Sequence, residues 1–103
     1  MEPKESQKSA VTVPDKIRAS HILVAQEFEA EDLVKLLAEG RKFEDLALRF
    51  SQCPSSRQGG DLGFFSARQM VEPFSEVAFG LKVGQISSPV RTQFGYHLIL
   101  RTS

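Results

Sequence analysis

Two histidines and one cysteine are the residues of this chain best suited to polar chemistry within an apolar site. His21 and His97 are the only histidines, and each lies in a run of apolar and β-branched residues typical of a strand. Cys53, the single cysteine, lies between them and shortly before the glycine-rich segment that starts at Gly59. Buried polar side chains are costly without partners, so these three groups are expected to share one polar centre in an apolar cleft.

Imidazole and thiol groups support several kinds of chemistry, and the residues alone leave them open. His21 and His97 are as consistent with a structural pair, bonded to each other or to Ser and Thr hydroxyls, as with a catalytic role. Cys53 fits an inert buried thiol, a Cys–His hydrolase nucleophile or a redox-sensitive thiol. A hydrolase is disfavoured because no third residue is placed to orient a nucleophile. One cysteine supplies no thiolate zinc cluster, and no metal site is expected.

Length and composition are those of one globular domain. The chain has 103 residues, of which 41% are apolar, and its 13 basic residues balance its 13 acidic ones. Zero net charge gives no basic field, so neither nucleic acid nor a membrane is expected as a partner. The apolar runs are too short to span a membrane, and the first 13 residues hold no signal-peptide core. With a single cysteine, a cytoplasmic protein is predicted.

Strands and helices must position these groups. Alternating and β-branched residues predict strands over residues 16–24, 61–65, 86–91 and 95–101, the third an edge strand because it contains a proline. Helical spacing of apolar residues predicts helices over 29–39 and 43–50, with Pro54 starting a short helical turn and Pro73 opening a third helix. Residues 1–15 are predicted to be a flexible tail before a domain of residues 16–103. This order predicts an α+β fold with a small, largely antiparallel sheet.

In the first and last predicted strands, alternate residues point to opposite faces of the sheet, which assigns each side chain to a face. In residues 16–24, Ile17, Ala19 and His21 are predicted to share one face with Leu23. In residues 95–101, the face of His97 is opposite to that of its immediate neighbours. Each histidine is therefore expected to lie on a face with apolar residues of its own strand.

Short motifs recur in one order from Lys16 to Thr102, and together they resemble the parvulin family of peptidyl-prolyl cis/trans isomerases. The motifs are Ser20-His21-Ile22-Leu23-Val24, Gly60-Asp61-Leu62-Gly63-Phe64-Phe65, Met70 with Glu72-Pro73-Phe74, Ala78-Phe79, Val83-Gly84, Ser88-Pro89-Val90 and Phe94-Gly95-Tyr96-His97-Leu98-Ile99. Each motif alone is weak, but their joint order and spacing make a chance match improbable. The resemblance implies a four-stranded antiparallel sheet surrounded by about four helices, no metal or organic cofactor, and action on the peptide bond preceding proline.

The resemblance also implies which residues form the polar part of the site. His21 and His97 correspond to the paired histidines of the family, and Cys53 corresponds to its central Asp-or-Cys position. Thr92 matches a hydroxyl beside the site. These four residues are the expected catalytic group, with the histidines either taking part directly or orienting the cysteine.

The apolar part of the site is implied in the same way. Leu62, Met70 and Phe74 correspond to the pocket that holds the proline ring. Phe94 lies at the rim, near the residue before proline. Ordinary core packing is the default for such residues, and it is the resemblance that favours a substrate pocket.

Two features bear on specificity. Cysteine at position 53 resembles the branch of the family that acts on phosphorylated Ser/Thr-Pro bonds. That branch carries a long basic loop after its first strand, whereas residues 25–32 here are short and acidic. An acidic segment repels phosphate, so phospho-independent activity is expected.

The function predicted from these observations is isomerisation of X-Pro bonds to assist protein folding, through non-covalent stabilisation of a twisted amide. The alternative is a non-catalytic peptide-binding or chaperone module that uses the same cleft. Both functions imply flexible or unfolded proline-containing polypeptides as partners. A monomer is expected.

Overall fold

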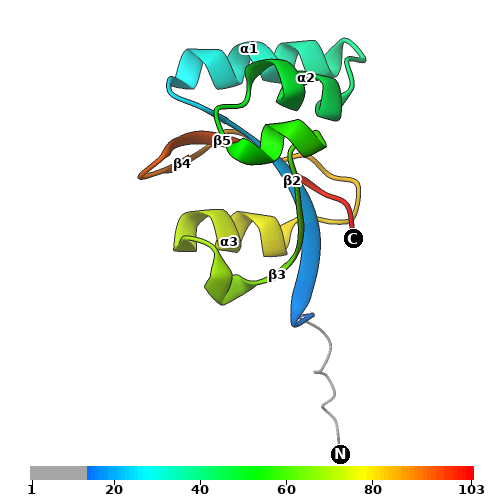
Figure 1. The fold of residues 1–103 in the computed structure, drawn as a ribbon, viewed down its shortest axis with the longest axis vertical. Helices are drawn as coiled ribbons and strands as arrows, with labels where there is room; N and C mark the ends of the chain where they lie inside the picture. Colours follow the sequence, from blue (N-terminus) through cyan, green and yellow to red (C-terminus); the bar gives the residue numbers. More distant parts are fainter. Residues whose placement is uncertain (1–13) are drawn as a thin grey trace, which may run out of the picture.

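The structure, a computed structural model, describes residues 14–103, so the predicted tail over residues 1–15 lies outside the described residues apart from its last two. Four strands form one sheet: β2 (Lys16–Val24), β3 (Asp61–Ser66), β4 (Val90–Thr92) and β5 (Gly95–Arg101). All neighbours pair antiparallel, in the order β3-β2-β5-β4. The two strands that carry the histidines are therefore adjacent at the centre of the sheet (Figure 1).

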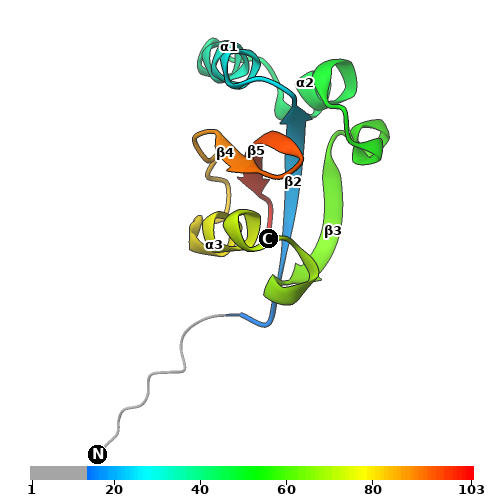
Figure 2. The same ribbon diagram turned by 90° about the vertical axis from the view of Figure 1, so that its left-hand side faces the viewer.

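Helices lie towards both ends of the long central strand. The elements are α1 (Glu27–Ala38), α2 (Phe43–Phe50), the 3-10 helices η2 (Pro54–Gln58) and η3 (Ala67–Gln69), and α3 (Glu72–Gly80). Figures 1 and 2 show α1 and α2 at one end of β2, and α3 towards the other. The predicted α+β fold is confirmed, with three α-helices and two 3-10 helices around the sheet in residues 14–103.

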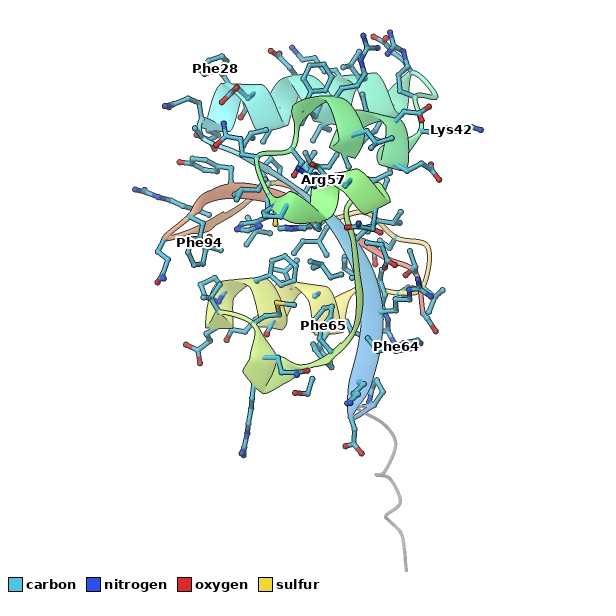
Figure 3. The ribbon with its side chains drawn as sticks, in the orientation of Figure 1. Phe28, Lys42, Arg57, Phe64, Phe65 and Phe94 are labelled. Carbon is cyan, nitrogen blue, oxygen red and sulfur yellow. The ribbon has the colours of Figure 1, made fainter. Side chains whose placement is uncertain are left out.

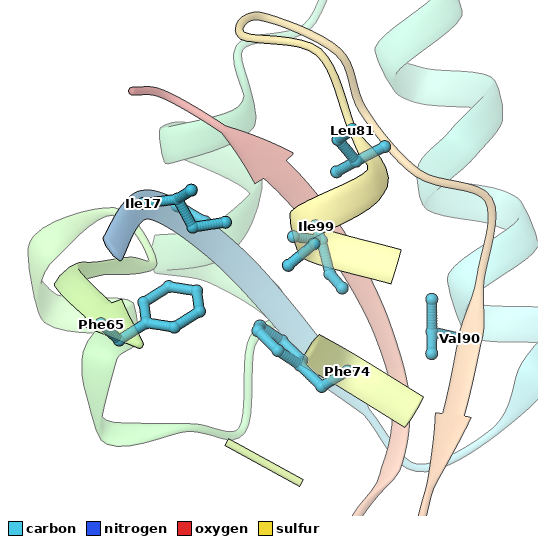
Figure 4. Close-up of a cluster of buried hydrophobic side chains, with 8 residues drawn as sticks. Ile17, Phe65, Phe74, Leu81, Val90 and Ile99 are labelled. Atoms are coloured by element: carbon cyan, nitrogen blue, oxygen red, sulfur yellow. The ribbon is translucent and has the colours of Figure 1, made fainter. Parts of the chain in front are cut away.

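Two apolar clusters cover opposite faces of the central strands, as the predicted period of two requires. On one face, Ile17, Ala19 and Ile99 pack with Phe65 and α3 (Figure 4). The other face packs against α1 and α2, and its strand residues are Ile22, Val24 and Leu98. By alternation, His21 and His97 lie on the α3 face. The sheet therefore brings both histidines to the side where α3 packs.

Two predicted boundaries are wrong by two residues or more, and local hydrogen bonding explains both. Helix α1 begins two residues earlier than predicted, since Gln26 N–H donates to the Glu29 carboxylate across the first turn (2.9 Å). The strand predicted over residues 86–91 shortens to the three residues of β4, with Ile86 keeping only an isolated bridge to β5. Pro89 precedes β4 and has no N–H to donate to a ladder.

Gly60 holds the β2 segment of the site in place. Its φ is +90°, its carbonyl accepts from His21 N–H (2.9 Å), and an added Cβ would overlap the His21 carbonyl oxygen. Gly60→Ala is therefore expected to lower the free energy of unfolding by about 3 kcal/mol or more, measured by urea unfolding. Gly63, with φ +69° and open space around it, is the matched control, and Gly63→Ala is expected to cost about 1 kcal/mol. Equal losses in the two variants would show that contact with β2 is unimportant.

Candidate active site

The two histidines form a hydrogen-bonded stack across the central strand pair. Leu23 of β2 is opposite His97 of β5, which places His21 on the diagonal from His97. Their ring centroids are 5.2 Å apart with an interplanar angle of 18°, and their Nδ1 atoms are 3.0 Å apart. The predicted association of the two histidines follows from this register.

Thr92 extends the pair into a chain of three side chains. Its Oγ1 lies 2.7 Å from His97 Nε2, and it accepts from Phe94 N–H at 3.1 Å. All three side chains of the chain are buried, so they exchange hydrogen bonds with one another instead of with solvent. Thr92 therefore lies behind His97 and fixes the ring, as a hydroxyl beside the site.

The Nδ1–Nδ1 hydrogen bond needs one proton between two nitrogens, so the chain has two possible polarities. When Thr92 donates to His97 Nε2, His97 donates from Nδ1 to His21, and His21 keeps its proton on Nε2. When His97 Nε2 donates to Thr92, the Nδ1–Nδ1 bond also reverses, so that His21 donates to His97, and His21 Nε2 carries a lone pair. His21 Nε2 is buried without a partner among residues 14–103. This atom is therefore the free end of the hydrogen-bonded series Thr92–His97–His21, as a donor in one polarity and an acceptor in the other.

Both imidazoles are neutral at pH 7. Burial lowers the pKa of His97 to about 4. Burial, and to a smaller extent the charge of a protonated His97, lower the pKa of His21 to about 4 as well. A proton added to either ring would have to be held in an apolar surrounding. At pH 7 the pair therefore forms hydrogen bonds and carries no positive charge.

One hollow of about 470 Å³ collects nearly all the residues singled out in the sequence. Its lining is His21, Leu23, Gln52, Cys53, Pro54, Leu62, Gln69, Met70, Val71, Phe74, Phe94 and His97. This lining contains no Asp, Glu, Lys or Arg. In the range 14–103, no three His, Cys, Asp or Glu side chains are placed to hold a metal ion. With neutral histidines, the hollow is an uncharged and largely apolar site.

Cys53 is held at the edge of this hollow by the end of β2. Gln52 N–H donates to the Leu23 carbonyl (2.8 Å), and the Ser51 hydroxyl accepts from the backbone N–H of Leu23 (3.0 Å) and of Cys53 (3.4 Å). Residues 51–53 are thereby fixed beside the histidine strand. Cys53 is partly exposed and directly precedes η2.

Phe74 is both a wall of the hollow and a core residue. Its ring meets His21 edge-on at 5.5 Å and His97 edge-on at 5.2 Å, and it packs against Phe65 at 6.1 Å. Only 2% of its surface is exposed. Leu62 and Met70 are partly buried against the same cluster. The apolar pocket and the core below α3 are therefore continuous.

Phe94 is placed differently from the other apolar residues of the site. It follows β4 in the turn to β5, its side chain is 60% exposed, and it lies at the edge of the hollow (Figure 3). An exposed aromatic ring at a rim offers contact area to a ligand at little cost in rotamer freedom. The structure thus places Phe94 at the hollow, and its contact with the residue before proline stays a prediction.

The comparison with protein families identifies the domain. Residues 6–103 match the family model described as rotamase, the PPIC-type peptidyl-prolyl isomerase domain. The chain belongs to this family. A solved relative, NmPin, described as the parvulin of Nitrosopumilus maritimus, is 42% identical with a TM-score of 0.79, and the match covers 87% of this chain and 98% of that one. The identification as a parvulin-type isomerase domain is therefore confirmed.

Other relatives of the isomerase domain are longer proteins. The foldase protein PrsA of Bacillus subtilis is 56% identical over 88 residues, which are 84% of this chain and 30% of PrsA. Its crystal structure gives a TM-score of 0.85 at 54% identity, covering 86% of this chain and 35% of that one. The putative isomerase Cbf2 of Campylobacter jejuni is 42% identical over 106 residues, covering 94% of this chain and 38% of Cbf2. The chain spans about a third of the length of these relatives.

The predicted cytoplasmic location is wrong. A structure with 45% identity and a TM-score of 0.80 is described as one of two SurA-like chaperones of C. jejuni, the virulence factor PEB4 and the periplasmic protein Cj1289. That description places a relative of this domain in the periplasm and so points away from the cytoplasm. A single unpaired cysteine is compatible with either compartment, so composition could not decide. No helix within residues 14–103 is long and apolar enough to cross a membrane.

Several residues of the site were not singled out in the sequence. They are Leu23, Gln52, Pro54, Gln69 and Val71. Leu23 was placed on the face of His21 by alternation, which was a sufficient signal. The other four flank Cys53 or Met70 in sequence, but irregular backbone gives no period from which to infer a direction. The only sequence signal for these four residues was therefore that each is adjacent to Cys53 or Met70.

Proposed function

We propose that the isomerase domain, over residues 16–103, catalyses cis/trans isomerisation of X-Pro bonds in polypeptides and so assists protein folding. The observation that carries this proposal is the uncharged hollow in which Leu62, Met70 and Phe74 lie beside Cys53 and the histidine pair. Membership of the PPIC-type family supports the same activity, as do relatives named foldase and isomerase.

Isomerisation requires only that the protein bind a twisted amide more tightly than a planar one. The barrier of roughly 18–20 kcal/mol comes from amide resonance, and exchange at an X-Pro bond otherwise takes tens of seconds or more. A twisted amide loses its dipolar resonance form, so an apolar surrounding favours it relative to water. Leu62, Met70 and Phe74 hold the proline ring, while the carbonyl side of the bond rotates.

The polar edge of the hollow faces that rotating carbonyl. His21 lines the hollow, and its Nε2 is the unpartnered, buried end of the Thr92–His97–His21 series, which in one polarity carries an N–H. Cys53 lines the same edge. A donor fixed in place before the reaction stabilises the oxygen in its rotated position without reorganising. His97 and Thr92 serve by fixing the ring and tautomer of His21.

The proposed activity does not depend on phosphorylation. The hollow is lined by no Lys or Arg side chain. The segment that follows β2 is acidic, since it forms the start of α1 and contains Glu27, Glu29, Glu31 and Asp32. Arg57 and Arg68 line neighbouring hollows instead. A phosphate before proline would be desolvated without a partner, which disfavours its binding.

Peptides that differ only in the residue before proline test this specificity. Exchange measured by NMR is expected to be fastest with leucine or phenylalanine in that position and at least about tenfold slower with phosphoserine, because a buried unpaired phosphate costs more than 1.4 kcal/mol. Glutamate separates the effect of charge from that of size, and its rate is expected between the two. Faster exchange with phosphoserine than with leucine would contradict the proposal.

A chaperone that binds peptides without catalysis is the second candidate, favoured by the description of a C. jejuni relative as SurA-like. It predicts peptide-induced shifts of Met70 and Phe74 signals with no change in exchange rate. In either case one chain supplies the whole hollow, so the domain is proposed to act as a monomer.

A further inference from the structure

A second and larger hollow, of about 910 Å³, lies directly beyond Met70. Met70 lines both hollows, so its side chain is the ridge between them. The far side of the ridge is formed by the segment before β2, by η3 and by one face of α3. Phe79 of α3, partly buried, supplies apolar surface there. The second hollow therefore adjoins the proposed proline site across Met70.

The walls of the second hollow are held by hydrogen bonds within the fold. The Ser75 hydroxyl donates to the Ala67 carbonyl at 2.6 Å and ties α3 to η3. Ser66 N–H donates to the Gln69 side-chain oxygen at 2.7 Å and closes the 3-10 turn. A surface held in this way binds a ligand with little loss of its own conformational freedom.

The two hollows differ in charge. The proline site has no charged residue, whereas the second hollow is lined by the carboxylates of Asp15, Glu72 and Glu76 and by one guanidinium, that of Arg68. Glu72 and Glu76 are one helical turn apart on α3, and so lie on the same face of that helix. The second hollow therefore presents a local excess of negative charge on an apolar floor, which complements a basic side chain with a long aliphatic stem.

The proline site also sets the direction in which a substrate chain must leave it. In the proposed function the carbonyl before proline faces Cys53, which directly precedes η2, and His21, whose backbone N–H donates to the Gly60 carbonyl just after η2. Figures 1 and 2 show α3 and the turn before it lying apart from residues 54–58, further towards the N-terminal end of β2. With the ring between these two segments, a substrate chain that continues away from η2 would reach Met70 and, beyond it, the second hollow.

We propose that the second hollow binds the substrate residues that follow proline and selects basic ones, lysine or arginine. This inference rests on the proposed isomerase function and names the sequence class that the enzyme prefers. Asp15, Glu72 and Glu76 set this preference, and Phe79 contacts the aliphatic part of the basic side chain.

Peptides with a fixed Leu-Pro bond, followed by two lysines, two glutamines or two glutamates, provide the test. The exchange rate at low salt is expected to be about three- to tenfold higher for the lysine peptide than for the glutamate peptide, and the ratio is expected to fall in 0.5 M NaCl. In Glu72→Gln/Glu76→Gln the ratio is expected to approach one. In Glu39→Gln/Glu44→Gln, which removes the same charge elsewhere, it is expected to stay at the wild-type value.

The outcomes separate this inference from the proposed function. If the protein does not accelerate exchange of the glutamine peptide, the isomerase function is overturned, and the substrate preference with it. Acceleration of all three peptides at equal rates overturns the preference alone, as does a lysine preference that survives in Glu72→Gln/Glu76→Gln. The lysine peptide is also expected to shift the NMR signals of Phe79. If the NMR signals of Phe79 instead shift with protein concentration in the absence of peptide, the second hollow is occupied by a second copy of the chain, which would contradict the inference.

Discussion

Replacing Phe74 with alanine is expected to abolish isomerisation and to lower the free energy of unfolding by about 3–5 kcal/mol. The ring is almost fully buried, meets both histidines edge-on and packs against Phe65, so its removal leaves a cavity below the site. It also removes one wall of the proposed proline pocket. Urea unfolding gives the loss of stability, and NMR exchange at 10 °C gives the activity of the folded fraction.

Two further variants separate lost activity from lost structure. Met70 is only partly buried, so Met70→Ala is expected to lower activity about tenfold or more with a smaller loss of stability. Val77 packs against the same cluster from α3 but does not line the hollow, and Val77→Ala is expected to keep wild-type activity. Wild-type turnover by Met70→Ala would mean that the proline ring binds elsewhere.

Acid is expected to destabilise the domain through its two histidines. Their pKa is about 4 in the folded state and near 6.5 in the unfolded state, so the folded state binds fewer protons between these values. Stability is then complete above pH 6.5 and is lost as the pH falls towards 4. Each histidine contributes about 3 kcal/mol to this loss, and because the rings share a hydrogen bond the two losses are not additive.

NMR titration of the imidazole signals measures this effect directly. Both histidines are expected to remain neutral down to about pH 5, and activity is expected to stay constant from pH 8 to about 5.5. The variant His21→Asn/His97→Asn has no histidine, so its stability is expected to be nearly independent of pH between 6.5 and 4.5. Titration of either imidazole near pH 6.5 would show that the pair is more solvated than its burial implies.

The sequence predicted those parts of the fold in which a period is strong. The bounds of β2 and β5, and the apolar residues that share a face with each histidine, followed from alternation over seven or more residues. Once the strands are adjacent, the stack of His21 on His97 is a consequence of register. The three-residue strand β4 was not predictable in this way, because three residues carry no period and its partner is fixed only by the turn to β5.

Tertiary packing decided the remaining features of the site. The bond from Thr92 to His97 depends on the pairing of β4 with β5, which no local pattern specifies. The double role of Phe74 in pocket and core depends on how α3 lies on the sheet. The hollow beyond Met70 joins the segment before β2 to α3, more than fifty residues away, so its excess of carboxylates could not be found from the sequence.

The central claim is that an uncharged hollow with two neutral histidines accelerates rotation about an X-Pro bond. Its most direct test is NMR exchange between the cis and trans forms of a short Leu-Pro peptide at pH 7, with the protein at a small fraction of the peptide concentration. We predict exchange that becomes faster in proportion to added protein and that is lost in Phe74→Ala. Shifts of Met70 and Phe74 signals on binding, with exchange as slow as in buffer, would contradict the claim.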